Sequence, residues 1–224
     1  MSRPHGDQHR ERLCTAMAEI YRRGWCDGTG GNFSCVLQRD PLRLLMAPSG
    51  VHKGRVQPPD LIDVDGSGAV LRGQGKASAE TALHLAIVEC CGAGAVLHTH
   101  SQAGTLLSQW ALQPPEATQA GQGGLTLRDL EMLKGLEGVT THATSVVIPV
   151  LANDQNLPRL AARARPLLPA APQGLLIAGH GLYAWGRELE TAQRHLEILE
   201  FLLEQHWRQL LLQALVASGP ARAR

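Results

Sequence analysis

Two short apolar runs in this chain of 224 residues lead directly into histidines. Residues 95–97 are followed by His98 and His100, and residues 175–178 are followed by His180. Short apolar runs are typical of buried β-strands, in which residues i and i+2 point to the same face. We therefore expect His98 and His100 to point the same way, at the end of a buried strand. Together with His180 they would hold a zinc ion and leave a fourth position open, as catalytic zinc sites do.

Each histidine also has a structural interpretation, and both interpretations stay open at this point. A His-x-His pair is often part of a satisfied core, and a histidine between two glycines, such as His180, can belong to a turn. The metal interpretation gains weight because all three histidines lie at the polar end of an apolar run. The other histidines singled out lack paired spacing, and we interpret them as structural or surface residues: His52, His84, His142, His195 and His206.

The composition limits the classes of partner. Charged residues make up 18% of the chain and the formal net charge is +1, so no strong field attracts nucleic acid or an acidic membrane. We expect neither partner. The five cysteines are an odd number without C-x-x-C spacing, which argues against a disulfide framework and fits a reducing compartment. The sequence shows no signal peptide and no uncharged run long enough to span a bilayer, so we expect a cytoplasmic protein.

Helical and strand patterns alternate along the chain, with no linker between separate cores. We expect helices over residues 7–23, 79–91 with Ser78 as N-cap, from 102, 126–134, 157–168 and 188–215. We expect strands over 33–37, 42–47, 61–64, 70–72, a segment ending at His98 and His100, 145–150, 175–178 and 182–185. Residues 114–124 are expected to form a mobile loop. The alternation predicts one α/β domain over residues 1–216, with helices on both faces of a sheet and a disordered tail over 217–224.

Three segments have features of anion-binding sites. Residues 28–32 are rich in glycine but lead into a strand, so they match neither a dinucleotide fingerprint nor a P-loop. Residues 48–53 form a second candidate, and Ser78 at a helix start forms a third. Each segment alone is explained as a turn or a cap. Their occurrence beside three histidines suggests a phosphorylated substrate held next to a metal.

The order of short motifs resembles the class II aldolase and adducin-head superfamily. The motifs are Gly31-Asn32, Pro48-Ser49-Gly50, Ser78-Ala79-Glu80, His98-Thr99-His100 and Gly179-His180-Gly181. Within the superfamily the chain is most similar to the methylthioribulose-1-phosphate dehydratase family of methionine salvage. That similarity rests on residues 24–31, 47–53, 131–135, 148–153 and 180–186. The resemblance spans about residues 10–205 and implies a three-layer α/β/α domain with a mixed, largely antiparallel sheet.

The resemblance also implies roles for individual residues. It implies that His98, His100 and His180 bind one Zn²⁺ per subunit, and that Glu131 is the acid and base of the dehydration. Glu80 aligns with a carboxylate that aldolases use as base and occasional zinc ligand. The residues matched to the substrate phosphate are Gly31, Asn32, Ser49, Gly50 and Ser78, with Lys53 in the same motif. The implied reaction removes water from 5-methylthioribulose 1-phosphate to give 5-methylthio-2,3-dioxopentyl 1-phosphate, in a homotetramer.

Two departures from the superfamily pattern leave alternatives open. Ala79 stands where a hydroxyl residue often precedes the glutamate, and residues 114–124 have no counterpart that we can match. Glu131 can also be read as a surface residue between inward-facing leucines. The first alternative is an aldolase or epimerase that acts on another ketose phosphate, such as fuculose or ribulose phosphate, with Glu80 as base. The second is a non-catalytic, adducin-like interaction module.

Overall fold

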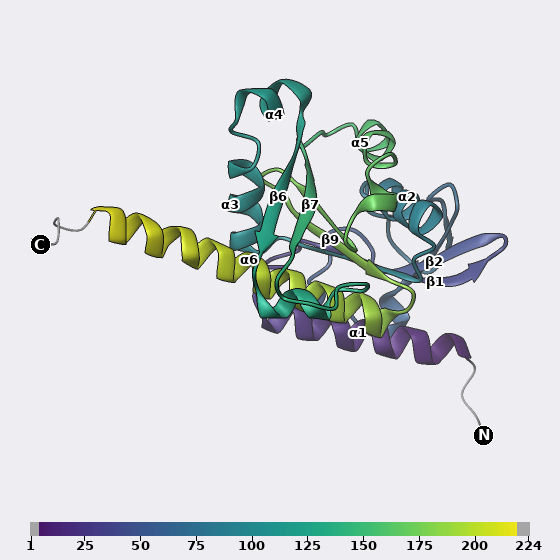
Figure 1. The fold of residues 1–224 in the computed structure, drawn as a ribbon. Coiled ribbons are helices and arrows are strands. Elements are labelled where there is room, and N and C mark those ends of the chain that lie inside the picture. Colours follow the sequence, from purple (N-terminus) through teal and green to yellow (C-terminus); the bar gives the residue numbers. More distant parts are fainter. Residues whose placement is uncertain (1–4, 219–224) are drawn as a thin grey trace, which may run out of the picture.

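A nine-stranded sheet runs through the molecule (Figure 1), and the computed structural model describes residues 5–218. The strands in chain order are β1 (Asn32–Arg39), β2 (Leu42–Met46), β3 (Ile62–Asp65), β4 (Val70–Arg72), β5 (Ala95–Thr99), β6 (Gln122–Arg128), β7 (Ser145–Leu151), β8 (Gly174–Ile177) and β9 (Gly181–Gly186). Their order across the sheet is β4-β3-β2-β1-β5-β9-β8-β7-β6. The β7–β8 pair is parallel and the other neighbouring pairs are antiparallel, so the predicted mixed, largely antiparallel sheet is confirmed.

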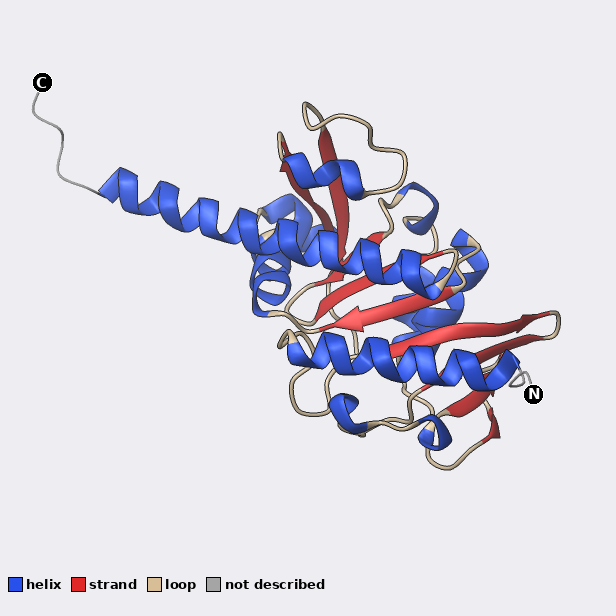
Figure 2. Ribbon diagram, turned by 90° about the horizontal axis from the view of Figure 1, so that it is seen from below, coloured by secondary structure: helices blue, strands red, loops and turns tan. Residues whose placement is uncertain are grey.

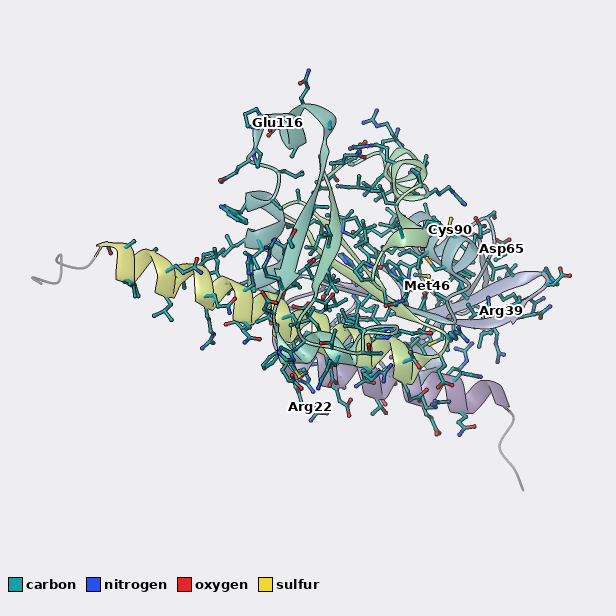
Figure 3. All side chains as sticks on the ribbon, in the orientation of Figure 1. Arg22, Arg39, Met46, Asp65, Cys90 and Glu116 are labelled. Carbon is teal, nitrogen blue, oxygen red and sulfur yellow. The ribbon has the colours of Figure 1, made fainter. Side chains whose placement is uncertain are left out.

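Helices cover both faces of the sheet, which confirms the three-layer prediction. One face carries α1 (His5–Arg22), α3 (Gln102–Trp110) and α6 (Leu189–Ser218), and Figure 2 shows α1 and α6 lying across it. The other face carries α2 (Thr81–Cys91) and α5 (Leu157–Ala164). Because strand residues alternate, Leu97 of β5 packs toward α1 and α6, whereas Val96 packs toward α2. Met46 is buried in the interior, while Arg39 and Glu116 extend outward (Figure 3).

The helix predicted over residues 126–134 is wrong. The structure has strand β6 up to Arg128, paired with all of β7, followed by the short 3-10 helix η3 (Glu131–Gly135). Leu125 and Leu127 are buried and alternate with exposed or half-buried residues, which is a strand period of two. The apolar residues from Leu127 onward have helical spacing in the sequence. The chain nevertheless turns at Asp129, whose φ is 56°, so no continuous helix forms. Residues 114–124, expected to be a loop, contain α4 (Pro115–Ala120) and the start of β6.

The expected cap of helix α2 is also displaced. The helix begins at Thr81 with Glu80 in the N-cap position, two residues after Ser78. Ser78 instead forms a turn before the helix: its carbonyl accepts the Thr81 N–H at 3.0 Å and its hydroxyl accepts the Glu80 N–H at 3.3 Å. This turn is the alternative backbone arrangement that serine side chains favour. It places the Glu80 side chain at the start of the helix, on the face that covers the sheet.

The remaining helical segments are short, apart from α6. Three further 3-10 helices connect the main elements: η1 (Lys53–Arg55), η2 (Pro58–Asp60) and η4 (Leu168–Ala170).

The C-terminal half of α6 projects away from the body (Figure 1) and exposes Leu211, Leu212, Leu215 and Val216. The helix continues to Ser218, so residues 217 and 218 of the expected tail are helical, and 219–224 lie outside the described residues. Among residues 5–218, no helix combines the length and apolar character needed to cross a bilayer.

Candidate metal centre

The three predicted histidines meet at the end of two neighbouring strands. His98 lies in β5, His100 follows that strand, and His180 lies in the turn between β8 and β9. Because β5 pairs with β9 in antiparallel register, the turn before β9 lies beside the end of β5. The Nε2 atom of His98 is 2.8 Å from that of His100 and 3.4 Å from that of His180. The predicted proximity of the three imidazoles is therefore confirmed.

Backbone contacts hold the His98 ring and the segment that carries His100. His98 is fully buried, and its Nδ1 lies 2.9 Å from the carbonyl oxygen of Leu182. Nδ1 therefore carries the hydrogen and donates a hydrogen bond to the Leu182 carbonyl, which leaves the Nε2 lone pair facing the other histidines. The backbone N–H of His100 donates to the carbonyl of Trp25 at 2.7 Å. The end of β5 is thus held to both β9 and the segment before β1.

Glu80 completes the group from the opposite side. One carboxylate oxygen, Oε1, lies 2.9 Å from Nε2 of His180 and 3.6 Å from Nε2 of His98. The other oxygen accepts a hydrogen bond from the Asn32 side-chain amide. Burial raises the pKa of Glu80, but the hydrogen bond with His180, the charges of His98 and His180 and the Asn32 amide together lower it below its ordinary value. Glu80 is therefore a carboxylate that faces the histidines.

The charge state of His98 and His100 suits metal binding. Burial is the largest influence on His98 and, aided by the neighbouring histidines, holds its pKa well below the usual value. Burial also lowers the pKa of His100, and the nearby His180 adds to this effect. Neutral imidazoles with free lone pairs are the form that binds metals. One ligand atom from each of the three histidines and from Glu80 lies within 4.8 Å of the others. This set of three nitrogens and one oxygen fits a divalent transition metal such as Zn²⁺.

Several of the predicted phosphate-binding residues lie around this group. Asn32 is buried in β1, and its amide nitrogen is 3.4 Å from the Ser78 hydroxyl as well as bonded to Glu80. The side-chain oxygen of Asn32 is buried and has no hydrogen-bond partner among the described residues. Lys53 is also buried, and its Nζ donates to the carbonyls of Thr29 and Val51 at 2.9 Å each. Lys53 therefore ties the glycine-rich loop to the segment that follows β2.

Gly31, Ser49 and Gly50 have a different environment. Gly31 has a φ of +71°, and a side chain there would place its Cβ 2.6 Å from the carbonyl oxygen of His98. Glycine at this position therefore lets the loop lie directly against β5. Ser49 and Gly50 are exposed, and the Ser49 N–H donates to the Lys76 carbonyl at 2.8 Å. No described contact joins Ser49 or Gly50 to the histidines.

Glu131 lies apart from His98, His100, His180 and Glu80 of its own chain. It begins η3, which packs against α6, on the face of the sheet opposite Glu80. Its side chain is 68% exposed and contacts the Lys134 ammonium and, at 3.7 Å, Nδ1 of His142. Hydrogen bonding to Lys134 is the largest influence on Glu131 and lowers its pKa. Within one chain, the predicted base therefore does not reach the histidines.

Comparisons with known proteins identify the family. Residues 11–207 match the family described as Class II Aldolase and Adducin N-terminal domain. The chain belongs to this family. A methylthioribulose-1-phosphate dehydratase from Methylococcus capsulatus is 43% identical over 189 residues, which are 83% of this chain and 86% of that protein. The dehydratase of the same name from Serratia proteamaculans is 41% identical over 93% of this chain and 98% of its own length. The predicted resemblance to methylthioribulose-1-phosphate dehydratases is confirmed.

Solved structures support the fold of this class II aldolase family member. The L-fuculose-1-phosphate aldolase from Thermus thermophilus superposes with a TM-score of 0.69, covering 96% of this chain and 100% of that one. Its sequence is 24% identical, so this likeness concerns the fold alone. The shared architecture agrees with the sheet order and the two helical layers described above.

Sequence reasoning missed two buried polar residues next to the three histidines. Tyr183 of β9 stacks on His98 with ring centroids 3.9 Å apart, and its buried hydroxyl interacts with Glu80. Glu200 of α6 is 2% exposed and hydrogen-bonds to Thr99, the residue between His98 and His100. The signal for Glu200 was present in the sequence. Polar residues follow one another as His98, Thr99, His100 and Ser101, so both faces of this segment need polar partners.

Proposed function

We propose that the chain catalyses the zinc-dependent dehydration of 5-methylthioribulose 1-phosphate in methionine salvage. The observation that carries the proposal is the convergence of His98, His100, His180 and Glu80 within 4.8 Å. The substrate is proposed from the relatives named as methylthioribulose-1-phosphate dehydratases, which match most of this chain. The product would be 5-methylthio-2,3-dioxopentyl 1-phosphate. A bound Zn²⁺ supplies a Lewis acid that polarises the ketone of the substrate.

The proton transfers fall to Glu131 in this proposal. The C3 hydrogen of the substrate lies next to the C2 ketone, and the Glu131 carboxylate removes it as a proton. The protonated Glu131 then donates a proton to the C4 hydroxyl, which leaves as water. The resulting enol tautomerises to the 2,3-diketone. One carboxyl group therefore acts first as base and then as acid, with no net change in its protonation.

Glu131 reaches a metal centre only if another copy of the chain provides it. Its carboxylate is exposed and lies on the opposite face of the sheet from Glu80. Two exposed apolar side chains, Met132 next to Glu131 and Phe201 on α6, line one surface pocket. We therefore propose a homo-oligomer, a tetramer by resemblance, in which η3 of one copy approaches the histidines of its neighbour.

The remaining groups would hold the substrate in place. Asn32, Ser78 and Lys53 lie near the ligands, and Gly31, Ser49 and Gly50 belong to the loops that we propose around the phosphate. Phosphate binding at one end of the sugar fixes C3 and C4 relative to the ligands and reduces the entropic cost of reaction. The five cysteines are all free, which supports a reducing compartment such as the cytoplasm.

The reaction is tested by supplying 5-methylthioribulose 1-phosphate to the zinc-loaded protein and following product formation by mass spectrometry. We expect loss of one water molecule per turnover. Retention of the substrate at saturating protein would contradict the proposal. Cleavage into two smaller fragments would instead establish aldolase chemistry.

The arrangement across subunits has its own test. Glu131→Gln and His98→Ala chains are each expected to be inactive, one without a base and the other without a complete ligand set. Unfolding and refolding a 1:1 mixture would form some sites with intact ligands from one chain and an intact Glu131 from the other. Random assembly predicts recovery of about one quarter of wild-type activity. No recovery in a mixture that assembles normally would contradict the role of a second copy.

An aldolase or epimerase is the second candidate, and Glu80 is the observation that favours it. Its carboxylate lies in the same chain as the histidines and directly beside them, where it would act as a base on a bound ketose phosphate. Glu80→Gln separates the candidates. A dehydratase that uses Glu131 keeps measurable turnover in this variant, whereas an aldolase that uses Glu80 loses the proton-transfer step.

A non-catalytic adducin-like module is the third candidate. An interaction module has no chemical need for three histidines and a carboxylate within 4.8 Å. Purified protein that binds no divalent metal would favour this alternative over both enzymes.

A further inference from the structure

Glu200 lies behind the metal centre, on the other side of strand β5. It belongs to α6, which crosses the face of the sheet opposite α2 (Figure 2), and its side chain is 2% exposed. Thr99 points toward α6 because strand residues alternate, and its hydroxyl donates a hydrogen bond to the Glu200 carboxylate. The Ser101 hydroxyl also interacts with Glu200 and lowers the pKa of its carboxyl group. One carboxyl group therefore interacts with both residues that flank His100.

This carboxyl group is in an unfavourable environment for a purely structural residue. Among residues 8–218, whose side chains the structure describes, no lysine, arginine or histidine forms an ion pair with Glu200, and the nearby Glu204 adds a like charge. Burial of a carboxyl group without a cation is costly, so a leucine would be the simpler choice for a helix packed on a sheet. The proposed proton transfers and substrate contacts do not use Glu200. Its position is explained if it serves the histidines on the other face.

The segment that Glu200 contacts is otherwise held by backbone contacts. His98 pairs with Tyr183 across β5 and β9, and the His100 N–H donates to the carbonyl of Trp25. Ser101 accepts the Gly104 N–H at 3.1 Å as the N-cap of α3. These contacts set the path of the chain, whereas the rotation of a strand residue about that path is set by side chains on both faces.

We propose that Glu200 is a positioning residue that fixes His98 and His100 for metal binding by holding Thr99 and Ser101 on the opposite face of β5. The inference rests on the metal centre of the proposed function. Loss of the hydrogen bond lets residues 98–101 twist, and the imidazole nitrogens then no longer converge at their present spacing. Metal affinity falls even though every ligand remains in the chain.

The test compares variants at both ends of the hydrogen bond. Thr99→Val keeps the shape but removes the hydroxyl, Thr99→Ser keeps the hydroxyl, and Glu200→Leu removes the acceptor. The probes are Co²⁺, followed by its visible absorption spectrum, and Zn²⁺, followed by competition with a chelating dye. We expect Thr99→Val and Glu200→Leu to weaken binding of each ion about tenfold or more, the size typical of residues that orient ligands. We also expect an altered Co²⁺ spectrum in both variants and a spectrum near wild type in Thr99→Ser.

Leu196→Ala provides the matched control for lost stability. Leu196 is fully buried on α6, one turn before Glu200, and has no polar contact with β5. We expect this variant to melt at a lower temperature while keeping wild-type metal affinity. Wild-type affinity in Thr99→Val, or an equal loss of affinity in Leu196→Ala, would overturn the role of Glu200. If Glu200→Leu fails to fold, the two Thr99 variants still show whether the hydrogen bond to Glu200 affects metal affinity.

The proposed function and this inference fail in different ways. Failure of the wild-type protein to bind Co²⁺ or Zn²⁺ would contradict the proposed metal centre itself. Wild-type protein that binds both ions, with unchanged binding in Thr99→Val, would remove only the role of Glu200. A Thr99→Val/Glu200→Leu double variant adds a check, because two changes to one hydrogen bond should not be additive.

Discussion

The histidine group and the Glu131 segment are held in place in very different ways. His98 is fully buried and fixed by a backbone carbonyl, and its neighbours come from paired strands of one sheet. Glu131 is 68% exposed at the start of a short 3-10 helix and is held by surface contacts with Lys134 and His142. The proposed metal ligands are therefore organised within one chain, whereas the proposed base depends on assembly. Substitutions among the histidines should therefore lower the amount of bound metal, whereas substitution of Glu131 should lower turnover and leave the metal in place.

The largest effect is expected at the buried region. His98→Ala removes a central ligand, so bound zinc should fall well below one ion per chain and turnover should fall to background. Metal content and activity are measured on the same preparation. His195→Gln is the matched control, because His195 is also buried but its Nδ1 donates to the Trp185 carbonyl, away from the four ligands. Full zinc content in His98→Ala would contradict the ligand assignment.

The exposed region should show the opposite pattern, with lost catalysis and intact metal. Glu131→Gln is expected to reduce kcat by about 10²- to 10⁴-fold, the usual contribution of a general acid or base. Zinc content and melting temperature should stay at wild-type values because the side chain is exposed. Glu137→Gln changes another exposed glutamate of the same segment and should keep normal turnover. Near-normal kcat in Glu131→Gln would remove this residue from the mechanism.

Glu200 gives a stability prediction for the interior. Burial is the largest influence on this group and raises its pKa from 4.5 to about 7. The folded state therefore holds a proton that the unfolded state releases, and the resulting stability is full below pH 4.5 and is lost as pH rises through 7. The shift corresponds to about 3 kcal/mol. Urea unfolding at several pH values should show this loss in wild type and its absence in Glu200→Gln. Parallel curves for the two proteins would contradict the buried environment of Glu200.

The smallest effect is expected from the partner of Glu131. The Lys134 ammonium lowers the pKa of Glu131, so Lys134→Ala should raise that pKa toward its ordinary value. Since the base must be ionised, the acidic limb of kcat/KM should move to higher pH, while activity at neutral pH changes little. Lys134→Arg keeps the positive charge and should keep the wild-type profile. An unshifted limb in Lys134→Ala would show that the ion pair is absent in the assembled enzyme.

The sequence was sufficient for the layered fold and for the placement of His98 and His100 on one face of a strand. Both depend on local rules: the period of two in a strand brings the two histidines to one face, and apolar runs of suitable length predict the buried strands. The approach of His180 depends on the pairing of β5 with β9, which no local rule predicts. The same rules failed for residues 122–135. Leu127, Leu130 and Leu133 have helical spacing in sequence, but the turn at Asp129 divides them between a strand and a 3-10 helix.

The environments of Glu131 and Glu200 could not be derived from spacing. Glu131 was a candidate through resemblance alone, and its separation from the histidines depends on which face of the sheet η3 covers. Glu200 lies on a helix about 100 residues after Thr99, and no local pattern pairs the two positions. Its polar character within an apolar stripe of α6 was nevertheless a visible irregularity, and a buried polar residue of this kind requires a partner.

The most direct test is a metal titration of chelator-treated protein with 5-methylthioribulose 1-phosphate as substrate. We expect no dehydration without metal, a linear rise in activity as Zn²⁺ is added, and saturation at one ion per chain. Dehydration at the full rate by metal-free protein, or activity that does not rise as Zn²⁺ is added, would contradict the proposed metal centre of His98, His100, His180 and Glu80.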